Sequence, residues 1–108
     1  MLRMSIALFI IGVFAASAAP PDAAQGEKVF AEQKCGLCHS IAGKGNPKGP
    51  LEEAVGKLTP ADVRAWITDA NAMTAKTKAT RKPAMKQFAL PKDDVDALVA
   101  YLSSIKKP

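Results

Sequence analysis

The stretch Cys35-Gly36-Leu37-Cys38-His39 decides how the rest of the chain is interpreted. The two cysteines lie three residues apart, so in a helical turn both sulfurs point to the same side of the backbone. The histidine follows directly, and Gly36 and Leu37 contribute no competing ligand. These residues are the chain's only two cysteines and its only histidine. Any chemistry that needs these side chains is therefore concentrated here.

Cys-x-x-Cys-His is the attachment signature of haem c. Each sulfur can form a thioether with one vinyl group of the porphyrin, and the imidazole of His39 can then reach the iron. A thioredoxin-like redox pair would follow a strand in an α/β pattern, and a closed zinc site would need four protein ligands. A disulfide would leave His39 unexplained. We predict that Cys35 and Cys38 bind one haem c covalently and that His39 is an axial ligand.

The second axial ligand must come from another residue type, because His39 is the only histidine. Methionine is the candidate, since Met/His ligation is an electron-transfer arrangement that raises the reduction potential. Met73 falls at the end of the helix expected around Trp66, where a packing role is more typical. Met85 lies on a loop stiffened by Pro83, just before the last expected helix. This loop position favours Met85.

The N-terminal segment has the pattern of an export signal. Arg3 precedes an uncharged run, Met4–Ala16, and small residues follow at 16–18. We predict a signal peptide over residues 1–18 and a mature domain over residues 19–108, in the periplasm. An uncleaved membrane anchor is the alternative. It is disfavoured because the uncharged stretch is shorter than the roughly 20 apolar residues that span a bilayer.

The 108-residue chain predicts one all-α domain. No segment alternates with a period of two, whereas apolar residues recur at helical spacing. The prolines and the residues that cap helices mark where the helices begin. The expected helices cover residues 23–34, a segment beginning at Pro60 after the N-cap Thr59, and a segment beginning at Pro91; loops are expected at 42–50 and 74–87.

The formal net charge of +5 indicates a moderately basic surface. Its lysines are spread along the chain, which is typical of a solvated surface and also compatible with steering toward an acidic partner protein. The sequence holds no aromatic-interleaved basic motif of the kind that binds nucleic acid. We therefore expect protein partners and no nucleic acid.

Nearly all of the predicted mature chain resembles class I cytochrome c. The Cys-x-x-Cys-His motif lies near the N-terminus, as in that family. Gly26 and Phe30 resemble the family's N-terminal helix contact, and Leu98 and Tyr101 resemble its partner on the C-terminal helix. The resemblance implies a class I fold with three or more helices packed around one covalently attached haem.

The resemblance also implies roles for further residues. Gly49-Pro50-Leu51 is similar to the segment whose proline carbonyl accepts a hydrogen bond from the ligand histidine, so Pro50 is expected to orient His39. Met85, sixteen residues before Tyr101, stands where the family's axial methionine is expected. The stretch after Pro50 is short compared with the mitochondrial pattern. Trp66 is therefore expected to be a core residue first and a haem-propionate contact second.

The function implied is that of a periplasmic electron carrier, not an enzyme, that cycles Fe(III)/Fe(II) between redox partners. The partners expected are proteins with acidic surfaces, such as an oxidase, a bc1-type complex or a dehydrogenase, and the membrane is met only through them. Two alternatives stay open. One is a haem enzyme subunit or gas sensor with an open sixth position, and the other is a module bound permanently to a dehydrogenase or oxidase.

Overall fold

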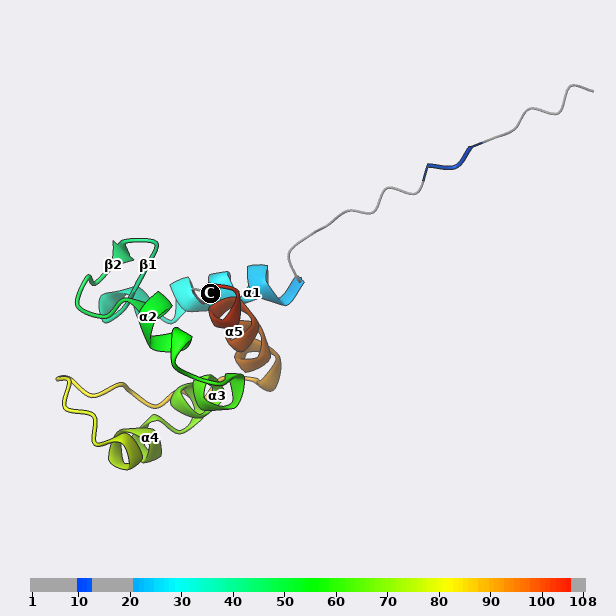
Figure 1. Ribbon diagram of the computed structural model, residues 1–108. Coiled ribbons are helices and arrows are strands. Elements are labelled where there is room, and N and C mark those ends of the chain that lie inside the picture. The colour runs from blue at the N-terminus through cyan, green and yellow to red at the C-terminus, as the bar shows by residue number, and fades with distance from the viewer. Residues whose placement is uncertain (1–9, 13–20, 106–108) are drawn as a thin grey trace, which may run out of the picture.

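The computed structural model describes residues 10–12 and 21–105, so the predicted signal peptide lies almost entirely outside the described residues. The described chain is mainly helical, with one small two-stranded hairpin (Figure 1), which confirms the predicted all-α class. Among the described residues, no helix has the length and apolar content needed to cross a membrane. The elements in order are α1 (Pro21–Glu32), η1 (Cys35–Leu37), β1 (Ser40–Ile41), β2 (Lys44–Gly45), α2 (Leu51–Gly56), α3 (Pro60–Thr68), α4 (Ala70–Thr77) and α5 (Lys92–Ser104).

Helices α1 and α5 cross in close contact near the two ends of the described domain (Figure 1). A side chain at Gly26 would collide with the backbone of Ala97 and with Tyr101, so glycine is what lets the two backbones meet. Next to the crossing, the rings of Phe30 and Tyr101 pack edge to face with centroids 6.0 Å apart. The helix contact expected from the sequence is confirmed.

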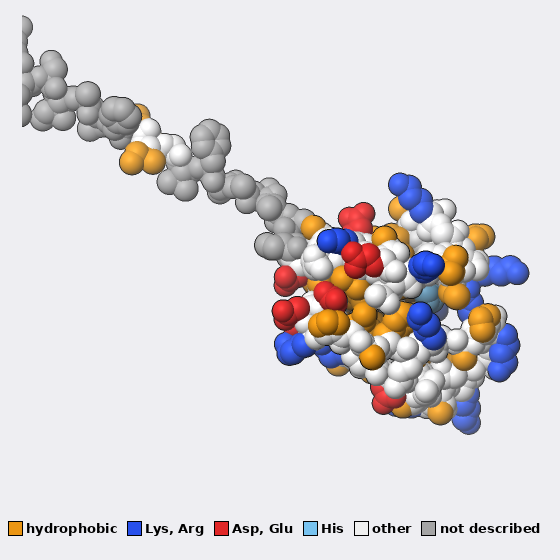
Figure 2. Space-filling view, turned by 180° about the vertical axis from the view of Figure 1, so that it is seen from behind, with side chains coloured by type: hydrophobic (Ala, Val, Ile, Leu, Met, Phe, Trp, Pro, Cys, Tyr) orange, Lys and Arg blue, Asp and Glu red, His pale blue; other side chains and the backbone are white. Residues whose placement is uncertain are grey.

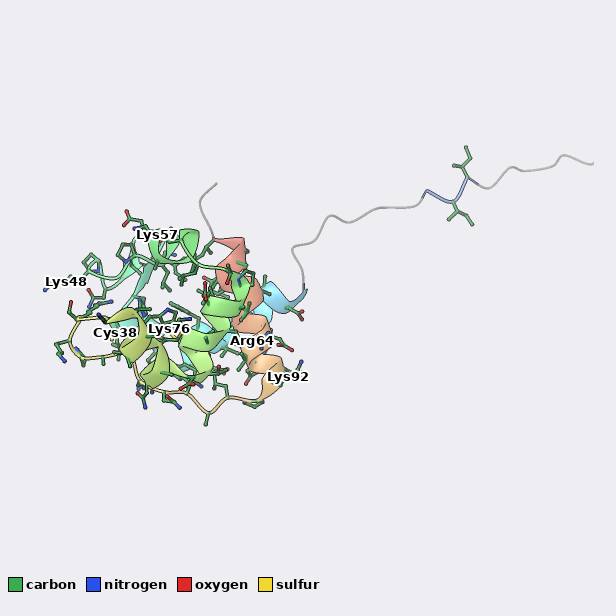
Figure 3. The ribbon with its side chains drawn as sticks, turned by 60° about the horizontal axis from the view of Figure 1, so that its bottom comes forward. Cys38, Lys48, Lys57, Arg64, Lys76 and Lys92 are labelled. Atoms are coloured by element: carbon green, nitrogen blue, oxygen red, sulfur yellow. The ribbon has the colours of Figure 1, made fainter. Side chains whose placement is uncertain are left out.

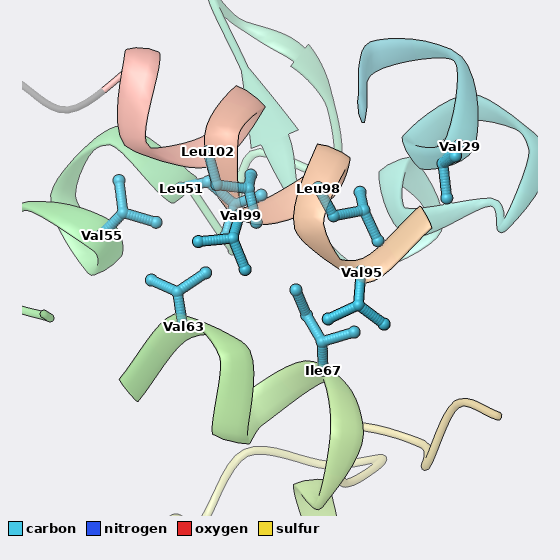
Figure 4. Packing of buried hydrophobic residues seen from close by; sticks show 9 residues of the cluster. All are labelled: Val29, Leu51, Val55, Val63, Ile67, Val95, Leu98, Val99 and Leu102. Carbon is cyan, nitrogen blue, oxygen red and sulfur yellow. The ribbon is translucent and has the colours of Figure 1, made fainter. Parts of the chain in front are cut away.

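Helix α5 is the centre of the hydrophobic core. Its apolar stripe is buried, and Val63 and Ile67 of α3 point toward it (Figure 4). Helix α2 and helix α1 complete the cluster from the other sides. The nine buried members are Val29, Leu51, Val55, Val63, Ile67, Val95, Leu98, Val99 and Leu102.

Helix α3 begins where the sequence predicts, because its first turn is capped. The Thr59 hydroxyl accepts a hydrogen bond from the Asp62 backbone N–H at 3.1 Å, and the Asp62 carboxylate accepts one from the Thr59 N–H at 3.2 Å. This capping box provides acceptors for two backbone N–H groups that have no acceptor within the helix. The guanidinium of Arg64 then pairs with Asp96 at 2.6 Å and ties α3 to α5.

Three local features differ from the sequence-based expectations. The expected loop 42–50 contains β2 of a hairpin, whose turn uses left-handed backbone at Ala42 and Gly43, with φ 51° and 76°. Helix α2 had not been expected. Helix α3 ends at Thr68, and the non-helical backbone of Asp69 separates it from α4, so Met73 lies within its own short helix.

Candidate functional site

The cysteine-containing segment is a tight turn placed directly after α1. Lys34 adopts left-handed backbone with φ 57°, which ends the helix and redirects the chain into η1. The backbone N–H groups of Cys38 and His39 both donate to the Cys35 carbonyl, at 3.2 and 3.0 Å. This turn brings both thiols and the imidazole onto one compact loop, as their spacing predicted.

The two thiols differ in their surroundings. Cys35 is half-buried, Cys38 is exposed, and neither is in a disulfide. Burial raises the pKa of the Cys35 thiol, and a backbone hydrogen bond and the nearby charge of Lys86 oppose that rise. The inner thiol is therefore held in its neutral form near neutral pH.

His39 is held in the form that can bind a metal. Burial lowers the pKa of its imidazole, the positive charge of Arg81 lowers it further, and a backbone hydrogen bond with Gly49 opposes both. A neutral ring nitrogen is the ligand that a metal requires. The backbone group that contacts the ring here is that of Gly49, one residue before the expected Pro50. The Pro50 carbonyl accepts from the Ala54 N–H at 3.5 Å, and its role toward His39 stays a prediction.

The four predicted ligand residues meet at one large cavity of about 710 Å³. Cys35, Cys38, His39 and Met85 all line it, although Met85 comes from a segment more than forty residues away. The remaining walls are mostly apolar and come from all the helices of the core. In the space-filling view, hydrophobic side chains reach the surface of the domain and lysine and arginine side chains lie around them (Figure 2). The arrangement is a nonpolar pocket with two thiols, an imidazole and a thioether facing it.

The two methionines take different places. Met73 is buried, 8% exposed, and is not among the residues that line the cavity. Met85 is half-buried on the irregular segment between α4 and α5. The sequence-based preference for Met85 as the ligand is therefore compatible with the geometry, and Met73 has the packing position expected for it.

Trp66 does not take the place expected for a core residue. It is half-buried and its side chain lines the main cavity, outside the cluster of fully buried residues. The physical reason is that the apolar face of α3 is shared: Val63 and Ile67 also belong to the core against α5. A periodic apolar stripe cannot show which of its members faces a cavity and which faces a neighbouring helix.

Sequence reasoning missed Arg81. It lies in the segment expected to be an irregular wrap, and its guanidinium donates a hydrogen bond to the Cys38 carbonyl at 2.5 Å. It also lines both the main cavity and a smaller hollow of about 280 Å³ on another side of His39. The available signal was that the other basic residues of this segment are lysines, whereas arginine has the planar fork that suits fixed hydrogen bonds.

Comparison with known proteins gives one family match. The model of the family described as cytochrome c matches residues 23–106. The chain is 33% identical over 91 residues to cytochrome c oxidase subunit 2 of Alkalihalophilus pseudofirmus (strain ATCC BAA-2126 / JCM 17055 / OF4). That match covers 76% of this chain and 25% of the relative, so the chain spans about a quarter of the relative's length. No solved structure matches.

Proposed function

The chain belongs to the cytochrome c family, and from this premise we propose that it is a periplasmic monohaem electron carrier. It would shuttle single electrons between redox partner proteins by Fe(III)/Fe(II) cycling of one haem c. The family itself implies a covalently bound haem c and haem-based electron transfer. The observation that carries the proposal is that Cys35, Cys38, His39 and Met85 line one apolar cavity.

The residues around the cavity fit a haem. A volume of about 710 Å³ lies in the range typical of ligand pockets, roughly 300–1,000 Å³, and apolar walls suit a porphyrin. Cys35 and Cys38 would hold the two thioethers, and His39 and Met85 the iron. We propose that the Pro50 segment orients the imidazole through a backbone carbonyl. When bound, the haem supplies the one-electron couple.

Ligation from both sides is the reason for proposing a carrier and not an enzyme. His39 and Met85 would both hold the iron, which would leave no open coordination position for a substrate. The chain's own contribution is to hold these two side chains, exclude water with apolar walls and set the potential through the identity of the axial ligands.

The basic side chains near the cysteine turn support acidic protein partners. Figure 3 shows Lys48 and Lys57 on the same side of the molecule as Cys38, whereas Arg64 and Lys92 lie toward the other side. Positive charge around the site would steer an acidic surface to it. An oxidase is the partner that the similarity to an oxidase subunit favours. A bc1-type complex or a dehydrogenase with an acidic surface would bind through the same basic side chains.

The same similarity favours one second candidate. Because the relative is named as a subunit of an oxidase, the chain could instead serve as a module bound permanently to a larger complex. Purification of the native protein at physiological salt separates the two candidates. A carrier elutes at the size of the single chain, and a module co-elutes in fixed stoichiometry with its complex.

The proposed ligation is tested by replacing Met85 with alanine. We expect the ferric protein to change from low spin to high spin, and its reduction potential to fall by a part of the roughly 0.8 V that axial ligands can span. Optical and electron paramagnetic resonance spectra with a potentiometric titration measure both. Met73→Ala is the matched control and should change neither. A wild-type protein that is already high-spin would favour an enzyme or gas sensor and contradict the proposal.

A further inference from the structure

The segment that carries Met85 depends on side chains for its attachment. Residues 80–90 make no backbone–backbone hydrogen bond with any other residue that the structure describes. Two side chains hold the segment on either side of the methionine. Arg81 donates to the Cys38 carbonyl at 2.5 Å, and the Gln87 amide oxygen accepts from the Asn71 N–H at 3.3 Å. The contact of Arg81 is charge-assisted and is therefore the stronger of the two.

We infer that Arg81 is a positioning residue that clamps the Met85 segment onto the Cys38–His39 backbone and so keeps the thioether at the iron. The inference rests on the proposed function, because it presumes that Met85 is a ligand. The Cys38 carbonyl directly precedes His39 in the chain. One hydrogen bond therefore joins the backbone of one proposed ligand to the segment that bears the other.

The fit of Arg81 at this position depends on a glycine opposite it. A side chain on Gly49 would collide with the Cys38 carbonyl and with the Arg81 guanidinium. The exposed guanidinium thus lies against the Gly49 backbone, with the Cys38 carbonyl as its acceptor. A lysine has a single point donor and no planar fork, so it would fit this position less well.

The contact also explains why one basic residue of the segment differs from its neighbours. The positive charge of Arg81 acts on the His39 ring as well as on the Cys38 carbonyl. Lys57 lines the same two hollows as Arg81. Lys57 is therefore a matched control: replacing it removes a positive charge from the same hollows without removing the hydrogen bond to Cys38.

The test measures how easily imidazole displaces Met85 from the ferric, haem-loaded protein. The red absorption band specific to a methionine sulfur on ferric haem reports the bound thioether. A net hydrogen bond is worth roughly 0.5–1.5 kcal/mol, so Arg81→Ala should lower the imidazole concentration for half displacement by about twofold to thirteenfold. Arg81→Lys should restore part of the loss. Lys57→Gln removes a positive charge from the same hollows and should leave the midpoint unchanged.

A second measurement does not depend on ligand exchange. Hydrogen–deuterium exchange of the haem-loaded protein should be faster over residues 80–90 in Arg81→Ala than in wild type, with α1 and α5 unchanged. Arg81→Gln replaces Arg81→Ala if the alanine variant does not load haem. Glutamine keeps the first methylene groups of the arginine side chain, but it is uncharged and too short to reach the Cys38 carbonyl.

The outcomes separate the inference from the function on which it rests. A wild-type protein without the methionine band overturns the proposed function itself. A wild-type protein with the band, and an Arg81 variant with an unchanged midpoint and unchanged exchange, overturns the clamp alone. An equal shift in Lys57→Gln also overturns it, because the effect would then come from charge and not from the bond to Cys38.

Discussion

Single residues prepare the site before any cofactor is bound. The imidazole of His39 has a lowered pKa, because it is partly buried and lies near Arg81. Burial is also the main reason why the pKa of the Cys35 thiol is raised. Both groups are thus kept neutral near neutral pH by the apolar surroundings that the cavity provides. A cavity of this kind favours an uncharged ring as ligand and a large apolar group as occupant.

The capping box of α3 gives a pH-dependent prediction for one carboxyl. Hydrogen bonds from the Thr59 hydroxyl and backbone hold the pKa of Asp62 below its ordinary value of 3.8. A lowered pKa means that the stabilisation is present above the ordinary value and is lost as the pH falls through the folded value. The urea midpoint of Asp62→Ala should therefore lie below that of wild type at pH 7, and the gap should close as the medium becomes acidic.

Thr59→Ala removes the hydroxyl that accepts from the Asp62 backbone N–H and is the companion variant. It should cost about 1 kcal/mol at neutral pH, the usual value of an N-cap hydroxyl. Equilibrium urea denaturation followed by circular dichroism measures both variants. A gap for Asp62→Ala that stays the same from pH 7 to pH 3 would show that the carboxylate does not act through this cap.

At the scale of elements, the crossing of α1 over α5 fixes where the cysteine turn lies. Helix α1 leads directly into η1, and α5 contributes the largest share of the buried core. The two helices can approach only because Gly26 has no side chain at the crossing. The ion pair between Arg64 and Asp96 adds a partly exposed link from α3 to α5, which contributes little by comparison.

Gly26→Ala should destabilise the protein by about 1–3 kcal/mol, because the added carbon forces the two backbones apart. Thermal and urea unfolding of the haem-loaded protein measure the loss. Gly56→Ala is the control, since the space around that glycine at the end of α2 is open. It should leave stability unchanged or raise it slightly. Equal effects of the two substitutions would mean that the close approach of α1 and α5 does not limit stability.

At the scale of the whole molecule, the helices that carry strong local signals were predictable. Thr59 with Pro60 marked the start of α3, and the periodic stripe of α5 marked the central helix. The turn at Ala42, the short helix α2 and the break at Asp69 were not predictable. Each depends on a few backbone angles that tertiary contacts select, and none has the usual local signature.

The candidate site was predictable to a different extent. Cys35, Cys38 and His39 form a contiguous motif, so local sequence was enough to bring them together. Met85 could be proposed from its loop position and from the family resemblance. Arg81 differs from the lysines around it, but its partner could not be predicted, because that partner is a backbone carbonyl forty-three residues away. A main-chain acceptor leaves no mark in the sequence, and only the folded chain shows which carbonyl is near.

The central claim is that one haem is attached covalently through Cys35 and Cys38, and intact-mass spectrometry of the exported, denatured protein tests it most directly. We predict one species with the mass of the chain plus one haem, and a chain that begins at Ala19. Cys35→Ala/Cys38→Ala should have the mass of the chain alone. A denatured wild-type protein with the mass of the bare chain would contradict the account.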